Sequence, residues 1–218
     1  MLTIAEQLLL LALHDEKGSV VFSASTALPY GLAGATLVDL FLAQRITVSD
    51  KKVQVLDKAP LGDEILDEAL QLIQASTKPH DLKYWVQRVH DKVKHLKDRL
   101  ADSLVQKGIL SREEHRWLRV FSSTRYPTED IAPEYEMRNT LRNIVLLDQE
   151  PDDRELALIG LVKACELVNE LFAKQERRAA KKRMKELTEG EVVGKAVAAV
   201  VAEMTAAVTV VIVAASSS

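Results

Sequence analysis

Apolar positions recur along most of the chain at helical spacing. In residues 62–74 the apolar side chains fall at i, i+3 and i+4 spacings, which predicts a helix with one buried face. Thr3 and Glu6 have the spacing of a capping box, so we expect a first helix from there to about Leu13. The same pattern predicts a helix that begins at residue 30, and helices at about residues 82–95, 96–107, 134–147 and 152–185.

Strand-like alternation is confined to short segments. Residues 45–48 and 53–56 alternate around a polar turn, which predicts a small β-hairpin, and residues 20–22 fit a short strand. Pro127 and Pro133 interrupt the chain, so the region around Trp117 is expected to be a loop or hairpin. No Gly/Ser/Pro-rich linker divides these elements. We therefore predict a mainly α fold, with residues 1–218 forming a single globular helical domain with small β-hairpins.

The tail from residue 196 to 215 is very apolar. Glu203 interrupts it, and about eleven residues follow without a charge, fewer than a helix needs to span a bilayer. We expect a buried terminal element rather than a membrane anchor.

Composition indicates a soluble protein with one sizeable core. The 218 residues are 47% hydrophobic and 28% charged. The single cysteine, Cys165, excludes an intrachain disulfide and falls in an apolar helical pattern, so we predict a buried thiol in a reducing compartment. The start of the sequence has no basic leader or cleavage signal, which favours a cytoplasmic location.

The net charge of −3 hides two basic zones. Residues 80–120 carry ten Lys/Arg against six Asp/Glu, and residues 174–185 carry seven against one. Two basic zones on an otherwise acidic protein indicate local partners of negative charge.

Catalytic and metal-binding motifs are missing from the sequence. There is no HExxH, no GxGxxG and no phosphate-binding loop, and the lone cysteine has no evident base nearby. The carboxylates of residues 63–68 fit a solvated helix face. We therefore expect no enzyme activity, no metal and no cofactor, and treat the histidines as surface or capping residues: His14, His80, His90, His95 and His115.

Four segments in register resemble the Golgi phosphoprotein 3 family. They are the leucine-rich start at residues 2–13 with Gly18, the Gly-Leu-Ala-Gly of residues 31–34, residues 61–68, and the Lys-Gly-Ile-Leu of residues 107–110. The resemblance implies a helical peripheral membrane protein that binds phosphatidylinositol 4-phosphate, and whose eukaryotic members hold glycosyltransferase tails. A chain without the basic leader of those members is expected to be a bacterial or otherwise reduced relative.

The resemblance also implies a headgroup site. Two basic positions three apart fall on Lys94 and Lys97, which keep the charge but lack the planar fork of arginine. The family's pocket tryptophan falls on Ser23 or Ala24, and its pocket arginine on Ala33. These substitutions are expected to weaken recognition of a specific inositide more than attraction to acidic phospholipid in general.

The family's extended hairpin corresponds to about residues 116–125. Its apolar residues would be Trp117, Leu118, Val120 and Phe121, which could enter a membrane surface or contact another subunit. The alternative is that Trp117 and Phe121 pack on the core. The basic segment 176–185 likewise fits either a membrane or nucleic-acid patch or the solvated end of a long helix.

Three functional hypotheses follow from these patterns. The leading one is a non-enzymatic peripheral adaptor on the cytosolic face of a membrane, with an acidic phospholipid surface and a protein client as partners. The second is a nucleic-acid-binding helical module that uses the hairpin of residues 45–56 as a wing, although the acidic balance argues against nucleic acid. The third is an oligomeric scaffold joined through the apolar tip.

Overall fold

The structure, a computed structural model, describes residues 1–117, 121–189 and 196–217. The described chain is mainly α-helical, with two antiparallel hairpins, as the sequence predicts. The elements run in the order α1 (Ile4–Leu11), η1 (Phe22–Ala24), α2 (Leu28–Leu42), β1 (Ile46–Ser49), β2 (Lys52–Val55), α3 (Glu64–Gln74), α4 (Leu82–Lys92), α5 (Leu96–Gln106), β3 (Glu113–Trp117), β4 (Phe121–Arg125), α6 (Ala132–Leu146), α7 (Asp153–Ala164), α8 (Val168–Leu171), α9 (Arg177–Glu189) and α10 (Ala196–Ser216).

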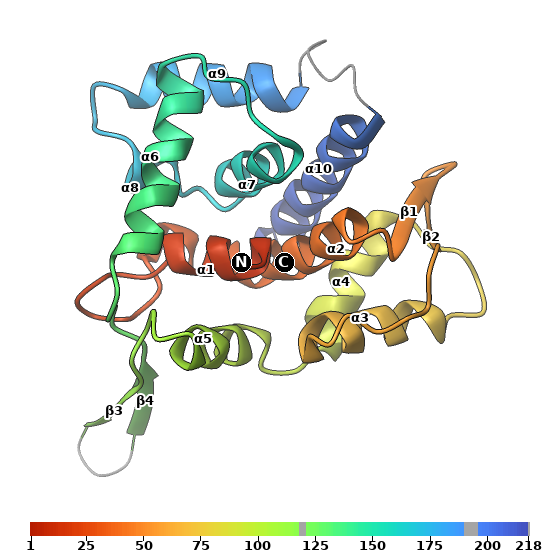
Figure 1. The fold of residues 1–218 in the computed structure, drawn as a ribbon, viewed down its shortest axis with the longest axis horizontal. Helices are drawn as coiled ribbons and strands as arrows, with labels where there is room; N and C mark the ends of the chain where they lie inside the picture. Colours follow the sequence, from red (N-terminus) through yellow and green to blue (C-terminus); the bar gives the residue numbers. More distant parts are fainter. Residues whose placement is uncertain (118–120, 190–195, 218) are drawn as a thin grey trace.

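Helices α1 and α2 form the centre of the molecule. Figure 1 shows α3 and α5 on one side of this pair, and α6, α7 and α9 on the other. Leu8, Leu9 and Leu32 are among the fully buried side chains there, and the buried residues of the surrounding helices continue the same core. This arrangement buries the middle of α2 and leaves its two ends near the surface.

Local sequence signals account for several helix starts. Thr3 and Glu6 form the expected capping box at α1, and Asp63 accepts hydrogen bonds from two amides at the start of α3. The hairpin of β1 and β2 turns through Asp50 and Lys51, both with positive φ, a geometry that matches the twist of the paired strands.

The expected helix over residues 152–185 is wrong, because the chain turns twice within it. The first turn follows α7, where Glu166 adopts a left-handed conformation with φ 59°. The second follows α8, where Phe172 is extended and its side chain is buried. Apolar residues keep helical spacing on both sides of these turns. Periodicity alone therefore cannot distinguish several short helices from one continuous helix.

Two smaller expectations also change. Residues 20–22 do not form a strand: Val20 makes one isolated bridge to Leu13, and Phe22 begins the 3-10 helix η1. Pro133 does not precede α6 but lies in its first turn, where its missing N–H costs nothing.

The apolar tail forms α10. By length and composition its residues 198–216 could cross a membrane, contrary to our count from the sequence, and 39% of that segment is buried inside the protein. One face, including Val201, Met204 and Val208, packs on α7, α2 and α4, whereas Val210 and Val213 are exposed. The tail is therefore a half-buried core helix, and the expectation of burial holds for one of its faces.

Gly34 allows α2 and α10 to approach closely. A Cβ at this position would overlap Cγ2 of Val208, whose branched side chain is stiff in a helix. We predict that Gly34→Ala lowers the free energy of unfolding by about 1–3 kcal/mol, although alanine gains up to about 1 kcal/mol in helix propensity. Urea denaturation followed by circular dichroism measures the change.

The control is the same substitution in a Val208→Ala background. Removing the methyl groups of Val208 leaves space for the new Cβ, so Gly34→Ala should then cost little or nothing. An equal loss of stability in both backgrounds would contradict the overlap.

Candidate functional site

Lys94 and Lys97 flank the break between α4 and α5. Val93 ends α4 with an extended backbone, and His95 turns the chain through a left-handed conformation with φ 54°. Lys94 donates a hydrogen bond to the Asp91 carbonyl, and Lys97 Nζ lies 3.1 Å from an Asp98 carboxylate oxygen. The turn thus brings two residues that the sequence singled out to the same corner.

Both lysines line one surface pocket of about 200 Å³. The first turns of α2 form one wall, and the α4–α5 break forms the other. Its lining residues are Pro29, Leu32, His90, Val93, Lys94, His95, Leu96, Lys97 and Asp98.

The start of α5 adds backbone donors to this pocket. His95 occupies the N-cap position, and no side chain caps the helix there. The first amides of a helix have no carbonyl partner within it, so an uncapped N-terminus attracts anions through its N–H groups and its dipole. Leu96, Lys97 and Asp98 are the first residues of α5 and all three line the pocket.

Two carboxylates moderate the positive charge of the pocket. The Asp91 carboxylate lies 2.9 Å from His90 Nδ1, and this hydrogen bond is the main cause that lowers the pKa of Asp91. Asp98 lines the pocket and pairs with Lys97. An anion that enters the pocket would compete with Asp98 for Lys97.

His90 and His95 are the pocket residues that sequence reasoning missed. His90 also stacks on Tyr30 of α2, with ring centroids 4.2 Å apart and planes inclined by 22°. The sequence offered one signal for their role in the pocket, which is that both histidines lie close to Lys94 and Lys97 along the chain. The sequence could not show that His90 lies beside both this turn and α2, because that position depends on how α2 packs against α4.

The other family positions lie elsewhere. Ser23 donates a hydrogen bond of 3.0 Å to Glu170 of α8, and Ala24 and Ala33 are fully buried. None of the three lines the pocket. Arg99 of α5, which follows the two lysines along the chain, pairs with Glu64 and Glu68 of α3.

The predicted hairpin at residues 116–125 forms as strands β3 and β4. Trp117 and Phe121 are the last cross-strand pair before the tip, and Leu118 and Val120 lie outside the described residues. Figure 1 shows the hairpin extending away from the helices. Its base is fixed to the protein, because the Tyr126 amide donates to the Gly18 carbonyl over 2.9 Å.

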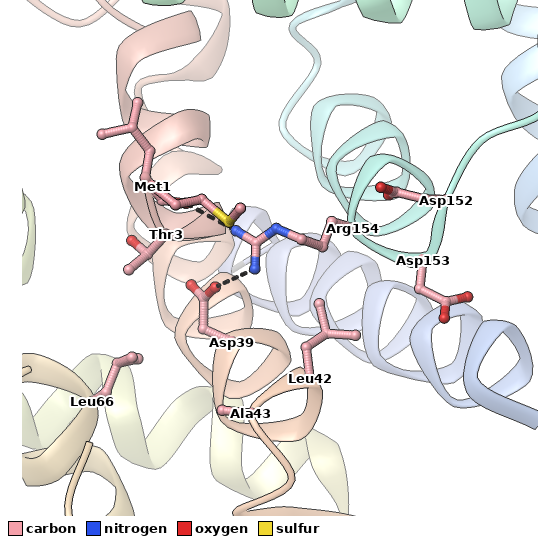
Figure 2. Close-up of a pocket in the computed structure, with 10 residues that line it drawn as sticks. Met1, Thr3, Asp39, Leu42, Ala43, Leu66, Asp152, Asp153 and Arg154 are labelled. Atoms are coloured by element: carbon pink, nitrogen blue, oxygen red, sulfur yellow. Dashed lines mark hydrogen bonds and ion pairs between the residues drawn. The ribbon is translucent and has the colours of Figure 1, made fainter.

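A larger cavity of about 500 Å³ lies at the other end of α2, beside the start of α1 (Figure 2). The Asp39 carboxylate accepts hydrogen bonds from the amides of Ile4 and Ala5, at 2.9 and 3.1 Å. Arg154 Nη1 lies 3.9 Å from the same carboxylate, and Nη2 donates to the Leu2 carbonyl. Burial raises the pKa of Asp39 to about 6 despite these donors. Asp39 and Arg154 thus hold the start of α1.

The described residues show no cluster of three or more His, Cys, Asp or Glu that could bind a metal ion. Cys165 is fully buried as predicted, and burial raises the pKa of its thiol to about 12. A thiol with that pKa is protonated at neutral pH and is a poor nucleophile.

Comparison with known proteins identifies one matching family and a similar protein. A model of the Golgi phosphoprotein 3 (GPP34) family matches residues 4–204. Vacuolar protein sorting-associated protein 74 of Eremothecium gossypii is 26% identical over 166 residues, which cover 66% of this chain and 49% of that protein. The chain thus spans about half the length of this curated relative.

The raised pKa of Asp39 predicts how stability depends on pH. Because the folded state holds this proton more tightly than the unfolded state, the free energy of unfolding falls as pH rises from about 4 to about 6 and then levels off. The contribution of Asp39 is up to about 3 kcal/mol. Urea denaturation of the wild type and Asp39→Asn across this range isolates it, because asparagine does not titrate. Parallel curves for the two proteins would contradict the assignment.

Proposed function

Because the chain belongs to the Golgi phosphoprotein 3 (GPP34) family, we propose that it is a non-enzymatic peripheral membrane adaptor that binds the headgroups of acidic phospholipids. In this proposal the headgroup site is the pocket at the α4–α5 break. Phosphatidylinositol 4-phosphate is the lipid that the family resemblance implies. No cofactor takes part.

The observation that carries the proposal is the convergence of positive groups in that pocket. Lys94 and Lys97 lie around the uncapped N-terminus of α5, with His90 and His95 beside them. A phosphate that enters there would meet two ammonium groups and free backbone donors. Each well-placed lysine near an acidic membrane contributes about 1 kcal/mol to binding.

The same pocket favours general attraction over strict recognition of one lipid. Lysine is a point charge, whereas arginine can grip a phosphate with two parallel hydrogen bonds. Ala33 and Ser23 supply neither the arginine nor the tryptophan of the family pattern, and Asp98 competes for Lys97. We therefore propose that phosphatidylinositol 4-phosphate is bound with little preference over other acidic phospholipids.

The tip of the β3–β4 hairpin is the proposed membrane anchor. Trp117, Leu118, Val120 and Phe121 combine aromatic and aliphatic surface that suits the headgroup region of a bilayer. A projecting hairpin fixed at its base could reach such a surface while the helices remain in water. The same tip could instead join subunits, which is the oligomeric scaffold considered from the sequence.

Location and client follow from the adaptor role. A relative named for vacuolar protein sorting supports a role in membrane traffic. We propose that the protein acts on the cytosolic face of a membrane and that a surface away from the lipid site holds a protein client.

Replacing Lys94 and Lys97 with glutamine tests the headgroup site. Glutamine removes both charges and keeps much of each side chain's length, so we predict about tenfold to thirtyfold weaker binding to vesicles that contain phosphatidylglycerol. Sedimentation with vesicles measures the change, and thermal unfolding confirms that the variant is folded.

Lys58→Gln with Lys78→Gln is the matched control. Both lysines are exposed in loops beside α3, and the double variant loses the same charge. Binding within about threefold of the wild type is expected for this control. Equal weakening of both double variants would show that only the total charge matters and would remove the site.

The hairpin tip is tested with Trp117→Ala combined with Leu118→Ala. If the tip enters the membrane, vesicle binding weakens because apolar burial is lost, while the size of the protein in solution stays the same. Vesicle sedimentation and size-exclusion chromatography provide the two measurements. A smaller species with unchanged vesicle binding would instead support the scaffold.

A further inference from the structure

His90 lies in the wall of the pocket at the α4–α5 break, and the fold holds its ring from two sides. The ring stacks on Tyr30 of α2, with centroids 4.2 Å apart. Its Nδ1 lies 2.9 Å from the carboxylate of Asp91, the next residue of α4. The side chain of His90 remains 30% exposed and lines the same pocket as Lys94 and Lys97. These contacts hold an imidazole beside the place where the proposed headgroup binds.

The contact with Asp91 determines which nitrogen of His90 takes up a proton. This hydrogen bond is the main cause that lowers the pKa of Asp91, so the carboxylate stays ionised. An ionised carboxylate only accepts hydrogen bonds, so Nδ1 is the donor and carries a hydrogen in both charge states of the ring. The ring therefore gains its second proton at Nε2, which changes from an acceptor to a donor. Because phosphate oxygens are acceptors, only the protonated ring offers them a charged donor at Nε2.

The fixed charges around His90 nearly cancel. The described lining of the pocket includes the ammonium groups of Lys94 and Lys97 and the carboxylate of Asp98. Asp91 adds a second carboxylate directly beside His90. With a neutral imidazole these four groups balance, and protonation of His90 gives the set a net positive charge. An acidic headgroup is then attracted more strongly.

The other helices that pack on α4 are α2, α3 and α10. The carboxylates of α3 are engaged elsewhere, by Arg99 or by the amides of residues 61 and 62. Asp39 of α2 holds the start of α1, far along the helix from Tyr30. The ionisable residues on these three helices, as far as the structure describes them, are Tyr30, Asp39, Glu64, Asp67, Glu68 and Glu203, and the exposed cations of α4 itself are Lys83, Arg88 and Lys92.

His95 is the second histidine of the pocket lining. It is exposed, and its side chain does not cap α5. An exposed side chain loses conformational entropy when a ligand fixes it, whereas the ring of His90 is already held by Tyr30 and Asp91. His90 is therefore the histidine that is better prepared to meet a phosphate.

We infer that His90 makes the binding of acidic phospholipid depend on pH, because its protonation adds a charged donor to the headgroup pocket. Binding is tighter in mildly acidic solution than in mildly alkaline solution, across the range of about pH 5 to 8 in which histidines change charge. This inference rests on the proposed function, since it concerns the same pocket. It adds a regulation that lysines do not supply, because lysine side chains ordinarily stay charged over that range.

His90→Gln tests the inference, and His14→Gln is the matched control. Glutamine is polar but does not titrate, and His14 is exposed in the turn after α1. The probe is vesicles of phosphatidylcholine with phosphatidylglycerol, whose headgroup keeps one negative charge at both about pH 5.5 and about pH 7.5. We expect the wild type to bind more tightly at the lower pH. This tightening should be about fivefold smaller in His90→Gln and unchanged in His14→Gln.

Asp91→Asn provides a test in the opposite direction. Asparagine removes the negative charge but keeps a side-chain oxygen that accepts a hydrogen bond from Nδ1. We expect about fivefold tighter vesicle binding at about pH 7.5, with the pH dependence retained. Asp50→Asn removes an exposed carboxylate from the turn between β1 and β2 and should stay within about twofold of the wild type. Equal binding by the two asparagine variants would contradict the charge balance around His90.

The remaining outcomes separate this inference from the proposed function. Thermal unfolding at both pH values shows whether each variant is folded. If the wild type binds acidic vesicles and His90→Gln keeps its full pH dependence, the role of His90 is wrong and the headgroup site stands. A pH dependence that His14→Gln or His95→Gln removes to the same extent would also overturn the role of His90. If the wild type binds acidic vesicles at neither pH, both the inference and the proposed function are wrong.

Discussion

Helix α2 is enclosed by other helices along most of its length, and the surface features described above depend on what meets its ends. Gly34 lets α10 approach, and Gly31 leaves space for Cys165 at the end of α7. Helix α2 also packs against α4 and α7. At its far end, Asp39 holds the start of α1 through two backbone amides. The first turns of α2 thereby lie beside the α4–α5 break, where Pro29 and Leu32 line the pocket of Lys94 and Lys97.

Several arginines are paired within the fold, whereas lysines line the pocket at the α4–α5 break. Arg99, Arg142 and Arg177 are each committed to partners within the fold. Lys94 and Lys97 line that pocket, and Lys97 pairs there with Asp98. Because lysine binds phosphate as a point charge with little directional preference, a surface built this way favours acidic membranes in general over one inositide. In the proposed function, the family relationship supports docking on a membrane, and the lysine pocket supports a broad choice of lipid.

Much of the fold was predictable from the sequence, since its signals were local. Thr3 and Asp63 marked helix starts through their own hydrogen bonds, and the alternation around Asp50 marked a hairpin. The corner at Glu166 and Phe172 was not predictable, because a left-handed residue and a buried extended one leave the apolar periodicity intact. The pocket around Lys94 and Lys97 was expected from family resemblance, whereas His90 joined it through packing on Tyr30.

The central claim is that positive groups at the start of α5 hold the protein on acidic membranes. The most direct test is sedimentation of the unaltered chain with three kinds of vesicle at low and high salt. These vesicles contain phosphatidylcholine alone, phosphatidylcholine with phosphatidylglycerol, or phosphatidylcholine with phosphatidylinositol 4-phosphate. The account predicts binding to both acidic vesicles at matched charge, weakened by salt, and none to phosphatidylcholine. Absence of binding to either acidic vesicle at low salt would contradict it.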